Sequence, residues 1–364
     1  MTDANGETQR LIHESLVADN PERLINELVT SGPDALQQVL AAAHTKANRY
    51  LPSLYEVVRR STYPAAVPVL QRNVDIGNYA TVSSVLWALA HNDEASALDI
   101  ALQHLTDPGA LFTTRAAAAS ALYGVKQPAA TQALHATLAE QQTDPDNPEL
   151  PLLLVNTATA LATTNDHSGA PALYRLMESD HETARSLATT ALRIVIDQDA
   201  LRQLATALAD PSAEVRGAAV DPVFLIGSPA AAELLLRRAE DDSDDTVRHN
   251  SLLRFGDILG LALGGLDDLS FAQDEWATTR SELDQDVCYR FGEAITLENL
   301  VEEFTEEEQL RERVAEELQI VTGIDVPSIF KQGGIDAVRI ATAEASIRPG
   351  RVHKWGYAQP LPQR

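Results

Sequence analysis

Short helical patterns of small and apolar residues alternate with polar turns along residues 93–256. Four segments share one layout, in which an acidic residue near a turn is followed by an arginine and then by an apolar helix. These arginines are Arg115, Arg185, Arg216 and Arg248, at steps of 70, 31 and 32 residues, and the step of 70 holds two repeats of about 35. A single helix pair of this size cannot bury its apolar face alone, so the pattern predicts stacked pairs, that is, an all-α fold of the α-solenoid type.

Second helices are expected between these segments, because Pro or a polar turn introduces further apolar runs. They cover residues 128–140, 201–209 and 229–240, and residues 150–163 predict the repeat that lacks an arginine. Weaker patterns predict helices over residues 21–30, 34–43, 65–72 and 80–90, and helices resume over residues 297–304 and 306–321. The abundance of Ala and Leu supports this reading, since both enter helices readily.

The acidic and basic residues of the repeat are predicted to be structural. The aspartate can cap the start of a helix by accepting hydrogen bonds from backbone N–H groups that have no partner within the helix. The arginine can reach the aspartate of its own repeat or of a neighbouring one, which would tie successive turns together. The expected structural anchors are Arg115, Asp180, Arg185, Asp210, Arg216, Asp244 and Arg248.

The phrase Asp-Pro-Ser-Ala-Glu-Val-Arg-Gly-Ala-Ala at residues 210–219 resembles the short HEAT-like repeats first described in phycobilin lyases. Deoxyhypusine hydroxylases contain similar repeats. The resemblance covers residues 95–256 clearly and continues in degenerate form back to about residue 20. It implies an α-solenoid, but repeats of this kind serve binding, scaffolding and, occasionally, catalysis.

The resemblance to deoxyhypusine hydroxylases implies metal-binding His-Glu pairs directly after the repeat arginine. The pairs in this chain are Ala116-Ala117, Ser186-Leu187, Gly217-Ala218 and His249-Asn250, of which only His249 matches. Phosphate-binding loops and nucleophile elbows are also missing from the sequence. We therefore predict no catalytic, cofactor-binding or metal-binding residues and no cofactor.

The chain divides by pattern into four parts. Degenerate helical repeats occupy residues 1–92, clear HEAT-like repeats residues 93–256, a glycine-containing break residues 257–282, and a helical cap with a tail residues 283–364. Around the break, four glycines occur among residues 256–265. They indicate either a linker or a helix packed through its glycine face, and we favour a helix that ends at Gly264-Gly265.

The C-terminal part combines an acidic block with a basic, aromatic tail. Residues 293–317 hold ten Glu and two Arg, whereas residues 331–364 hold six basic residues and two acids. The Thr-Gly ending at residues 322–323 and the Pro-Gly-Arg segment at residues 349–351 resemble the ending of uncharacterised bacterial HEAT-repeat proteins. The tail either folds back as a cap or docks on a partner. The candidate docking residues are Arg348, Arg351, Lys354, Trp355 and Tyr357.

The charge balance limits the classes of partner. The chain has 53 acidic and 28 basic residues, a net charge of −25, which opposes binding to nucleic acid. Its one cysteine, Cys288, excludes an intrachain disulfide and a cysteine-based metal cluster. The longest apolar run, residues 258–266, is far shorter than the roughly 20 residues of a membrane helix, and residues 1–7 do not read as a signal peptide. We expect a cytoplasmic protein without membrane insertion.

These observations favour a non-catalytic scaffold that presents a solenoid groove to a partner protein. The acidic helices would suit a basic or amphipathic partner. The alternative is an enzyme or small-ligand-binding protein on a HEAT array, metal-dependent and hydroxylase-like or else lyase-like, with its site near the glycine break.

Overall fold

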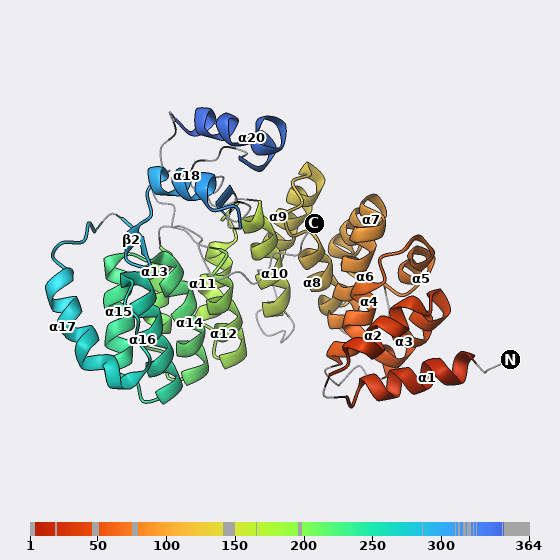
Figure 1. The fold of residues 1–364 in the computed structure, drawn as a ribbon. Helices are drawn as coiled ribbons and strands as arrows, with labels where there is room; N and C mark the ends of the chain where they lie inside the picture. Colours follow the sequence, from red (N-terminus) through yellow and green to blue (C-terminus); the bar gives the residue numbers. More distant parts are fainter. Residues whose placement is uncertain are drawn as a thin grey trace. The chain divides into compact units, whose positions relative to one another are not determined.

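The computed structural model describes residues 4–18, 20–45, 51–74, 79–140, 150–164, 166–195, 199–285, 287–309 and 326–343, together with residues 311, 314, 315, 318, 322, 324 and 345. Helices make up most of these residues, and the strands among them form a single short hairpin (Figure 1). The predicted all-α solenoid of stacked helices is confirmed. Two compact units divide the chain, Met1–Gly169 and Ala170–Leu361.

The first unit is a stack of short helices whose small side chains allow close packing. In α8, Ala116–Ala119 are completely buried, and this helix packs on α6, α7 and α10. The predicted helices over residues 21–30, 34–43, 65–72, 80–90 and 128–140 are all present. The elements are α1 (Ala4–Ser15), α2 (Glu22–Thr30), α3 (Pro33–Thr45), α4 (Pro52–Arg60), η1 (Pro64–Ala66), α5 (Val67–Arg72), α6 (Tyr79–Asn92), α7 (Glu94–Thr106), α8 (Phe112–Ala121), α9 (Pro128–Glu140) and α10 (Leu150–Thr163).

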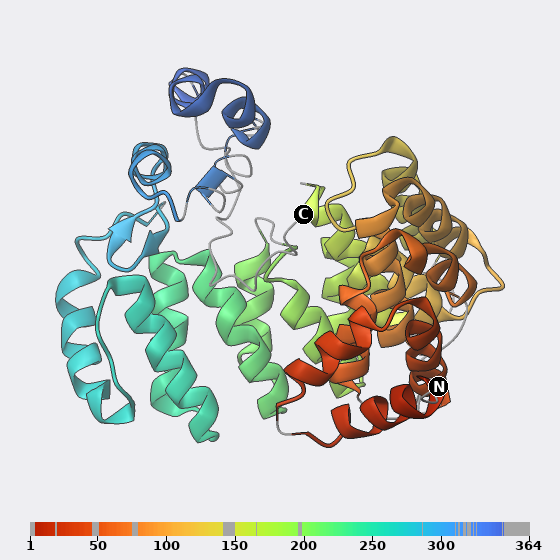
Figure 2. The same ribbon diagram turned by 45° about the vertical axis from the view of Figure 1, so that its right-hand side comes forward.

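The second unit begins with three helix pairs, α11 (Ala170–Met177) with α12 (Glu182–Ala191), α13 (Ala200–Ala207) with α14 (Ala213–Ile226), and α15 (Pro229–Asp241) with α16 (Asp245–Leu259). The second helices of these pairs pack on one another in order, α12 on α14 and α14 on α16. Figure 2 shows these helices, coloured from yellow-green to cyan, standing in a row. Each of α12, α14 and α16 carries one of the repeat arginines.

The helix expected to reach Gly264-Gly265 ends earlier, so that prediction was wrong. α16 stops at Leu259, and Gly260 follows in the left-handed conformation with φ +71°. The N–H groups of Gly260 and Leu261 both donate to the carbonyl of Gly256, which closes the helix end. After η2 (Leu266–Asp268), α17 (Leu269–Thr279) packs on α15 and α16.

A hairpin from later in the chain explains why the helix stops there. β1 (Tyr289–Arg290) pairs antiparallel with β2 (Glu293–Ala294). The backbone N–H of Phe291 donates to Asp257 O at 2.6 Å, and that of Tyr289 donates to Gly227 O at 2.7 Å. A Cβ on Gly260 would lie 2.6 Å from Phe291 O, so only glycine allows the hairpin to approach this helix end.

The C-terminal helices have a small core of their own. α18 (Leu297–Glu306) and α20 (Val326–Thr342) meet, and the rings of Phe304 and Phe330 pack edge to face with centroids 5.3 Å apart. The helix predicted over residues 306–321 and the Thr-Gly ending lie partly outside the described residues, and the tail from residue 346 onward lies wholly outside them. The four-part division of the chain stays a prediction.

Candidate protein-binding face

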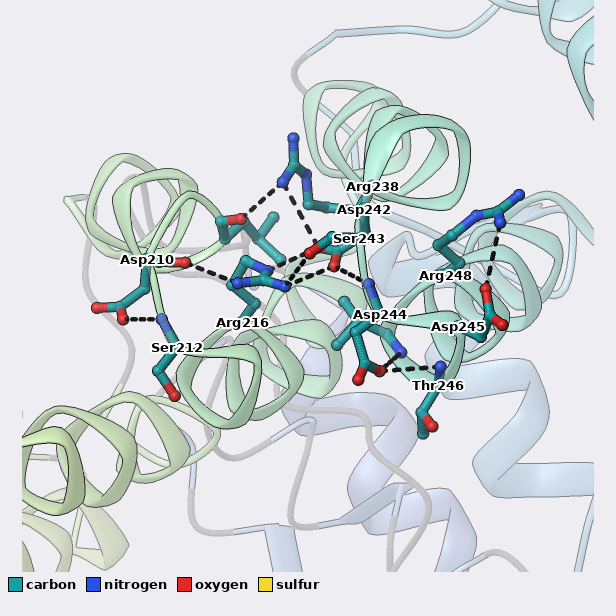
Figure 3. Close-up of polar contacts among 12 residues, drawn as sticks. Asp210, Ser212, Arg216, Arg238, Asp242, Ser243, Asp244, Asp245, Thr246 and Arg248 are labelled. Atoms are coloured by element: carbon teal, nitrogen blue, oxygen red, sulfur yellow. Dashed lines mark hydrogen bonds and ion pairs between the residues drawn. The ribbon is translucent and has the colours of Figure 1, made fainter.

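Two of the repeat arginines, Arg216 and Arg185, join successive turns of the second unit in the same way, and Figure 3 shows the contacts of Arg216. Arg216 Nε and Nη2 donate to the two carboxylate oxygens of Asp242 at 2.8 and 2.7 Å, while its Nη1 donates to the carbonyls of Asp210 and Pro211 at 2.9 and 3.1 Å. Each such arginine therefore binds the turn before its own helix and the turn before the next arginine-bearing helix. We call this arrangement the arginine clamp.

Arg185 makes the second clamp. Its Nε and Nη2 donate to Asp210 at 2.7 and 3.0 Å, and its Nη1 donates to the carbonyls of Ser179 and Asp180 at 2.9 and 3.2 Å. The carboxylates lie 25 and 26 residues beyond their arginines. Both pairs are bidentate, which is the strong geometry for a guanidinium and a carboxylate.

The clamps favour the ionised carboxylates. Hydrogen bonds from Arg185 lower the pKa of Asp210. Burial of Asp242 opposes its ionisation, but the hydrogen bonds from Arg216 and from the backbone N–H of Asp244 outweigh burial, so its pKa is also lowered. The Asp242 side chain is completely buried, and removal of Arg216 would leave its charge compensated only by the longer contact to Arg238 at 3.5 Å.

The outer two arginines depart from this pattern. Arg115 donates to the carbonyl of Leu105 and to Glu140, both at 2.9 Å, so its acidic partner lies 25 residues on but is a glutamate. Arg248 donates to the carbonyl of Ala239 at 3.2 Å and pairs with Asp245 of its own first turn at 3.3 Å. The last repeat arginine therefore ties only its own repeat.

The three predicted aspartate anchors turn out to occupy different positions relative to the arginine. The N-cap residue lies four positions before each arginine and is Leu111, His181, Ser212 or Asp244. Of the aspartates, only Asp244 is an N-cap, where it accepts from the N–H groups of Thr246 and Val247. The expectation that Asp180 and Asp210 cap helices was wrong. The N-cap of α12 is His181, one residue after Asp180, and the N-cap of α14 is Ser212, two residues after Asp210.

Sequence reasoning missed Asp242. It lies six residues before Arg248, as Asp210 lies six residues before Arg216. Alignment of the two Val-Arg pairs would have matched Asp242 with Asp210 and Asp244 with Ser212. Because residues 240–242 and 244–245 are all acidic, the sequence did not indicate which of them corresponds to Asp210.

The same register defines an open face on the arginine-bearing helices. Positions two before and one, two and five after each arginine follow helical i, i+3, i+4, i+7 spacing and so share one side of the helix. In α12, α14 and α16 all of them are partly or fully exposed. We call these positions the register face: Thr183, Ser186, Leu187 and Thr190; Glu214, Gly217, Ala218 and Asp221; Thr246, His249, Asn250 and Leu253.

An ion-pair network crosses the register face between α14 and α16. Arg254 Nε donates to Asp221 at 2.8 Å, and its Nη1 donates to Asp257 at 2.9 Å. Its guanidinium also lies over the Phe224 ring, 5.0 Å from the centroid. Two carboxylates thus hold one cation, and with Glu214 two helical turns before Asp221 the surface stays net negative.

The family model for HEAT repeats matches residues 170–253. The second unit contains HEAT repeats. The predicted resemblance is thereby confirmed for the part of the chain that holds the clamps and the register face. No curated protein matches the chain in sequence.

Two solved structures are similar to the chain. The CpcE–CpcF complex of phycocyanin lyase from a Nostoc species is 18% identical with a TM-score of 0.38, over 66% of this chain and 94% of that chain. Human deoxyhypusine hydroxylase in complex with glycerol is 17% identical with a TM-score of 0.27, over 70% of this chain and 96% of that chain. Both TM-scores are below 0.5, so neither similarity indicates a function for the HEAT repeats.

The exposed register face distinguishes α12, α14 and α16 from α8, the corresponding helix of the first unit. In α8 the positions one and two after the arginine are Ala116 and Ala117, and both are completely buried. The equivalent residues Gly217 and Ala218 of α14 are partly exposed. The register face is therefore open in three successive helices and not wherever the arginine occurs.

Other candidate chemistry gains no support from the described residues. They contain no group of three or more His, Cys, Asp or Glu side chains that could hold a metal ion. Among the same residues, no helix is both long enough and apolar enough to cross a membrane. The candidate docking residues of the tail lie outside the described part of the chain.

Proposed function

We propose that the chain is a non-catalytic scaffold whose HEAT repeats bind a partner protein on the register face. The observation that carries this proposal is that the same four positions are partly or fully exposed on α12, α14 and α16. Stacked repeats create extended binding surfaces in this way, because each repeat presents equivalent residues to a partner. The arginine clamps support the proposal, since they join the turns before α12, α14 and α16.

The charge of the register face favours a basic or amphipathic partner. Glu214 and Asp221 lie on it, the single Arg254 is held between two aspartates, and the chain as a whole has a net charge of −25. Complementary charge speeds association and selects among partners. Leu187 and Leu253 supply apolar contact area between the polar positions.

The tail is a second candidate docking segment in this proposal. Arg348, Arg351, Lys354, Trp355 and Tyr357 combine positive charge with aromatic rings, and Trp, Tyr and Arg are the types most enriched at binding hot spots. A cytoplasmic location and the absence of nucleic-acid binding stay predictions. No specific observation among the described residues favours the alternative, an enzyme or ligand-binding protein.

Affinity capture from a lysate of the source organism, with identification by mass spectrometry, tests the scaffold. The unmodified chain would be compared with Leu253→Arg on the register face, with Ala230→Arg on the exposed side of α15, and with the double variant Arg351→Ala, Trp355→Ala. We expect a discrete partner with the unmodified chain and with Ala230→Arg, and its loss with Leu253→Arg. Equal capture by all four proteins, or capture of no partner by any of them, would contradict the proposal.

A further inference from the structure

The C-terminal end of α16 takes part of its hydrogen bonding from the hairpin. The last carbonyl groups of a helix have no N–H partner within the helix. In α16 the hairpin supplies donors for two of them, because the N–H of Phe291 donates to Asp257 O at 2.6 Å and that of Gly292 donates to Ile258 O at 3.1 Å. Without the hairpin these acceptors would turn to water, and the last turn of α16 would fray more easily.

The same turn holds the ion-pair network of the register face. The Asp257 carboxylate accepts from Arg254 Nη1 at 2.9 Å, and Arg254 Nε donates to Asp221 of the register face at 2.8 Å. Asp257 therefore binds the hairpin through its backbone carbonyl and the network through its side chain. Movement of this one residue acts on both contacts.

The hairpin also contacts the C-terminal helices, through Arg290. Its Nη2 donates to Glu303 of α18 at 2.8 Å, and the two side chains are only 11% and 23% exposed. α18 and α20 have an apolar core of their own, to which Phe304 and Val338 belong. The hairpin thus links two separately packed parts, the HEAT repeats and the C-terminal helices.

The docked hairpin contains a strained residue. Phe291 and Gly292 connect β1 to β2, and both have positive φ, +50° and +83°. Two-residue turns with positive φ at both positions favour Asn-Gly, and a bulky side chain in this conformation is uncommon. Release of the hairpin lets this turn relax, so strain at Phe291 opposes the hydrogen bonds that hold the hairpin on α16.

We propose that the hairpin is a latch that couples the C-terminal helices to the register face. When it is docked, it completes the last turn of α16, and that turn fixes Arg254. When it is released, the turn frays and Arg254 loses Asp257, while the C-terminal helices keep their own core. The inference rests on the proposed function for the role of the register face, but the coupling itself needs no partner. Coupling of this kind is reciprocal, so a change at either end should act on the other.

Hydrogen exchange of the full-length chain, followed by mass spectrometry, tests the coupling from the register face. Arg254→Met keeps an apolar side chain over Phe224 but removes both ion pairs. The amides of residues 289–292 should then exchange at least about threefold faster, a modest factor because the pairs are partly exposed. The control is Arg202→Met, which removes an exposed ion pair to Asp199 at 3.3 Å and should change the hairpin less than about 1.5-fold.

Gly227→Ala tests the coupling from the hairpin. The N–H of Tyr289 donates to Gly227 O, and an added Cβ would lie 2.7 Å from Tyr289 O, which opposes docking at the end of α14. Although position 227 is not part of α16, the amides of residues 256–260 should exchange at least about threefold faster. The amides of α18 and α20 should be unchanged. Asp257→Asn, which weakens the pair with Arg254, is the second variant if Arg254→Met fails to fold.

The outcomes separate the latch from the scaffold. Hairpin exchange that is no faster in Arg254→Met than in Arg202→Met would overturn the latch, as would unchanged exchange of residues 256–260 in Gly227→Ala. Faster exchange of α18 and α20 together with the hairpin would also overturn it, because the C-terminal helices would then unfold instead of detaching. None of these outcomes depends on a partner, so unchanged capture by Leu253→Arg would overturn the register face and leave the latch in place.

Discussion

Arg216 on α14 holds both carboxylate oxygens of Asp242, at 2.8 and 2.7 Å, across the boundary between two successive HEAT repeats. Arg238 from α15 approaches the same carboxylate to 3.5 Å. The pair is buried and fully hydrogen-bonded, and neither side chain belongs to the register face. We therefore assign it to stability and not to partner recognition.

Replacement of Arg216 by Ala should destabilise the chain by about 3 kcal/mol, because it removes the bidentate partner of the buried Asp242 carboxylate and leaves Arg238, at 3.5 Å, as the remaining cation beside it. Denaturant unfolding measures this loss. The double variant Arg216→Met, Asp242→Leu serves as the control and should recover part of the stability, since no uncompensated charge remains. An unchanged unfolding midpoint accompanied by loss of partner capture would show that Arg216 acts in binding instead.

Stability should fall in acid as Asp210 and Asp242 are protonated. Both have lowered pKa values in the folded chain, so the unfolded state binds more protons in this range. Their stabilising contribution is complete above the ordinary carboxyl pKa of about 4 and is lost as the pH falls through the lower folded values. The unfolding midpoint measured from about pH 6 to about pH 2 should drop mainly below about pH 4. Asp242→Asn should lower the midpoint at the upper end and flatten this drop, and an equally steep drop would argue against the assignment.

Two glycine-to-alanine changes should have opposite effects. Gly260→Ala places a Cβ 2.6 Å from Phe291 O at a φ of +71°, so it should destabilise the chain by more than about 1 kcal/mol and loosen the hairpin. Gly217→Ala meets only an ordinary contact in a helix and should stabilise it by about 0.5–1 kcal/mol. Hydrogen exchange of residues 289–294 checks the first effect and thermal unfolding both. Equal effects of the two changes would refute the role given to Gly260.

Two serines provide a similar contrast. Ser251 is completely buried, and its hydroxyl has no hydrogen-bond partner among the described residues. Ser251→Ala should therefore leave stability unchanged or raise it by about 1 kcal/mol. Ser212 is the N-cap of α14 and accepts from the N–H of Glu214, so Ser212→Ala should lower stability by about 1 kcal/mol. Calorimetry measures both effects, and a clear loss of stability in Ser251→Ala would show that the Ser251 hydroxyl makes a hydrogen bond in the folded chain.

The repeat and its helices could be predicted because their signals are local. Helix propensity, apolar spacing and turn residues act within one helix, so the ranges around α9, α13 and α15 followed from the sequence alone. The role of Asp244 as an N-cap belongs to the same class, because a cap reaches only two or three residues along the chain. The expected anchors Arg185 and Arg216 likewise occur where the repeat pattern put them.

The partners of these anchors could not be predicted from local signals, because they depend on which turns the helix packing brings together. Arg216 binds Asp242 and not Asp244 because the stacking of α14 on α16 brings the Asp242 carboxylate to the guanidinium. The end of α16 is likewise fixed by a hairpin about 30 residues later, whose Phe291 leaves room only for glycine at position 260.

The sequence by itself determined the helical repeat, its period and the positions of its arginines. Only the tertiary structure decided that positions 217 and 218 are open whereas positions 116 and 117, in the same register, are buried. The physical reason is that a helix has the same local pattern wherever it lies, whereas exposure depends on the neighbours that cover it. The register face is a product of that packing.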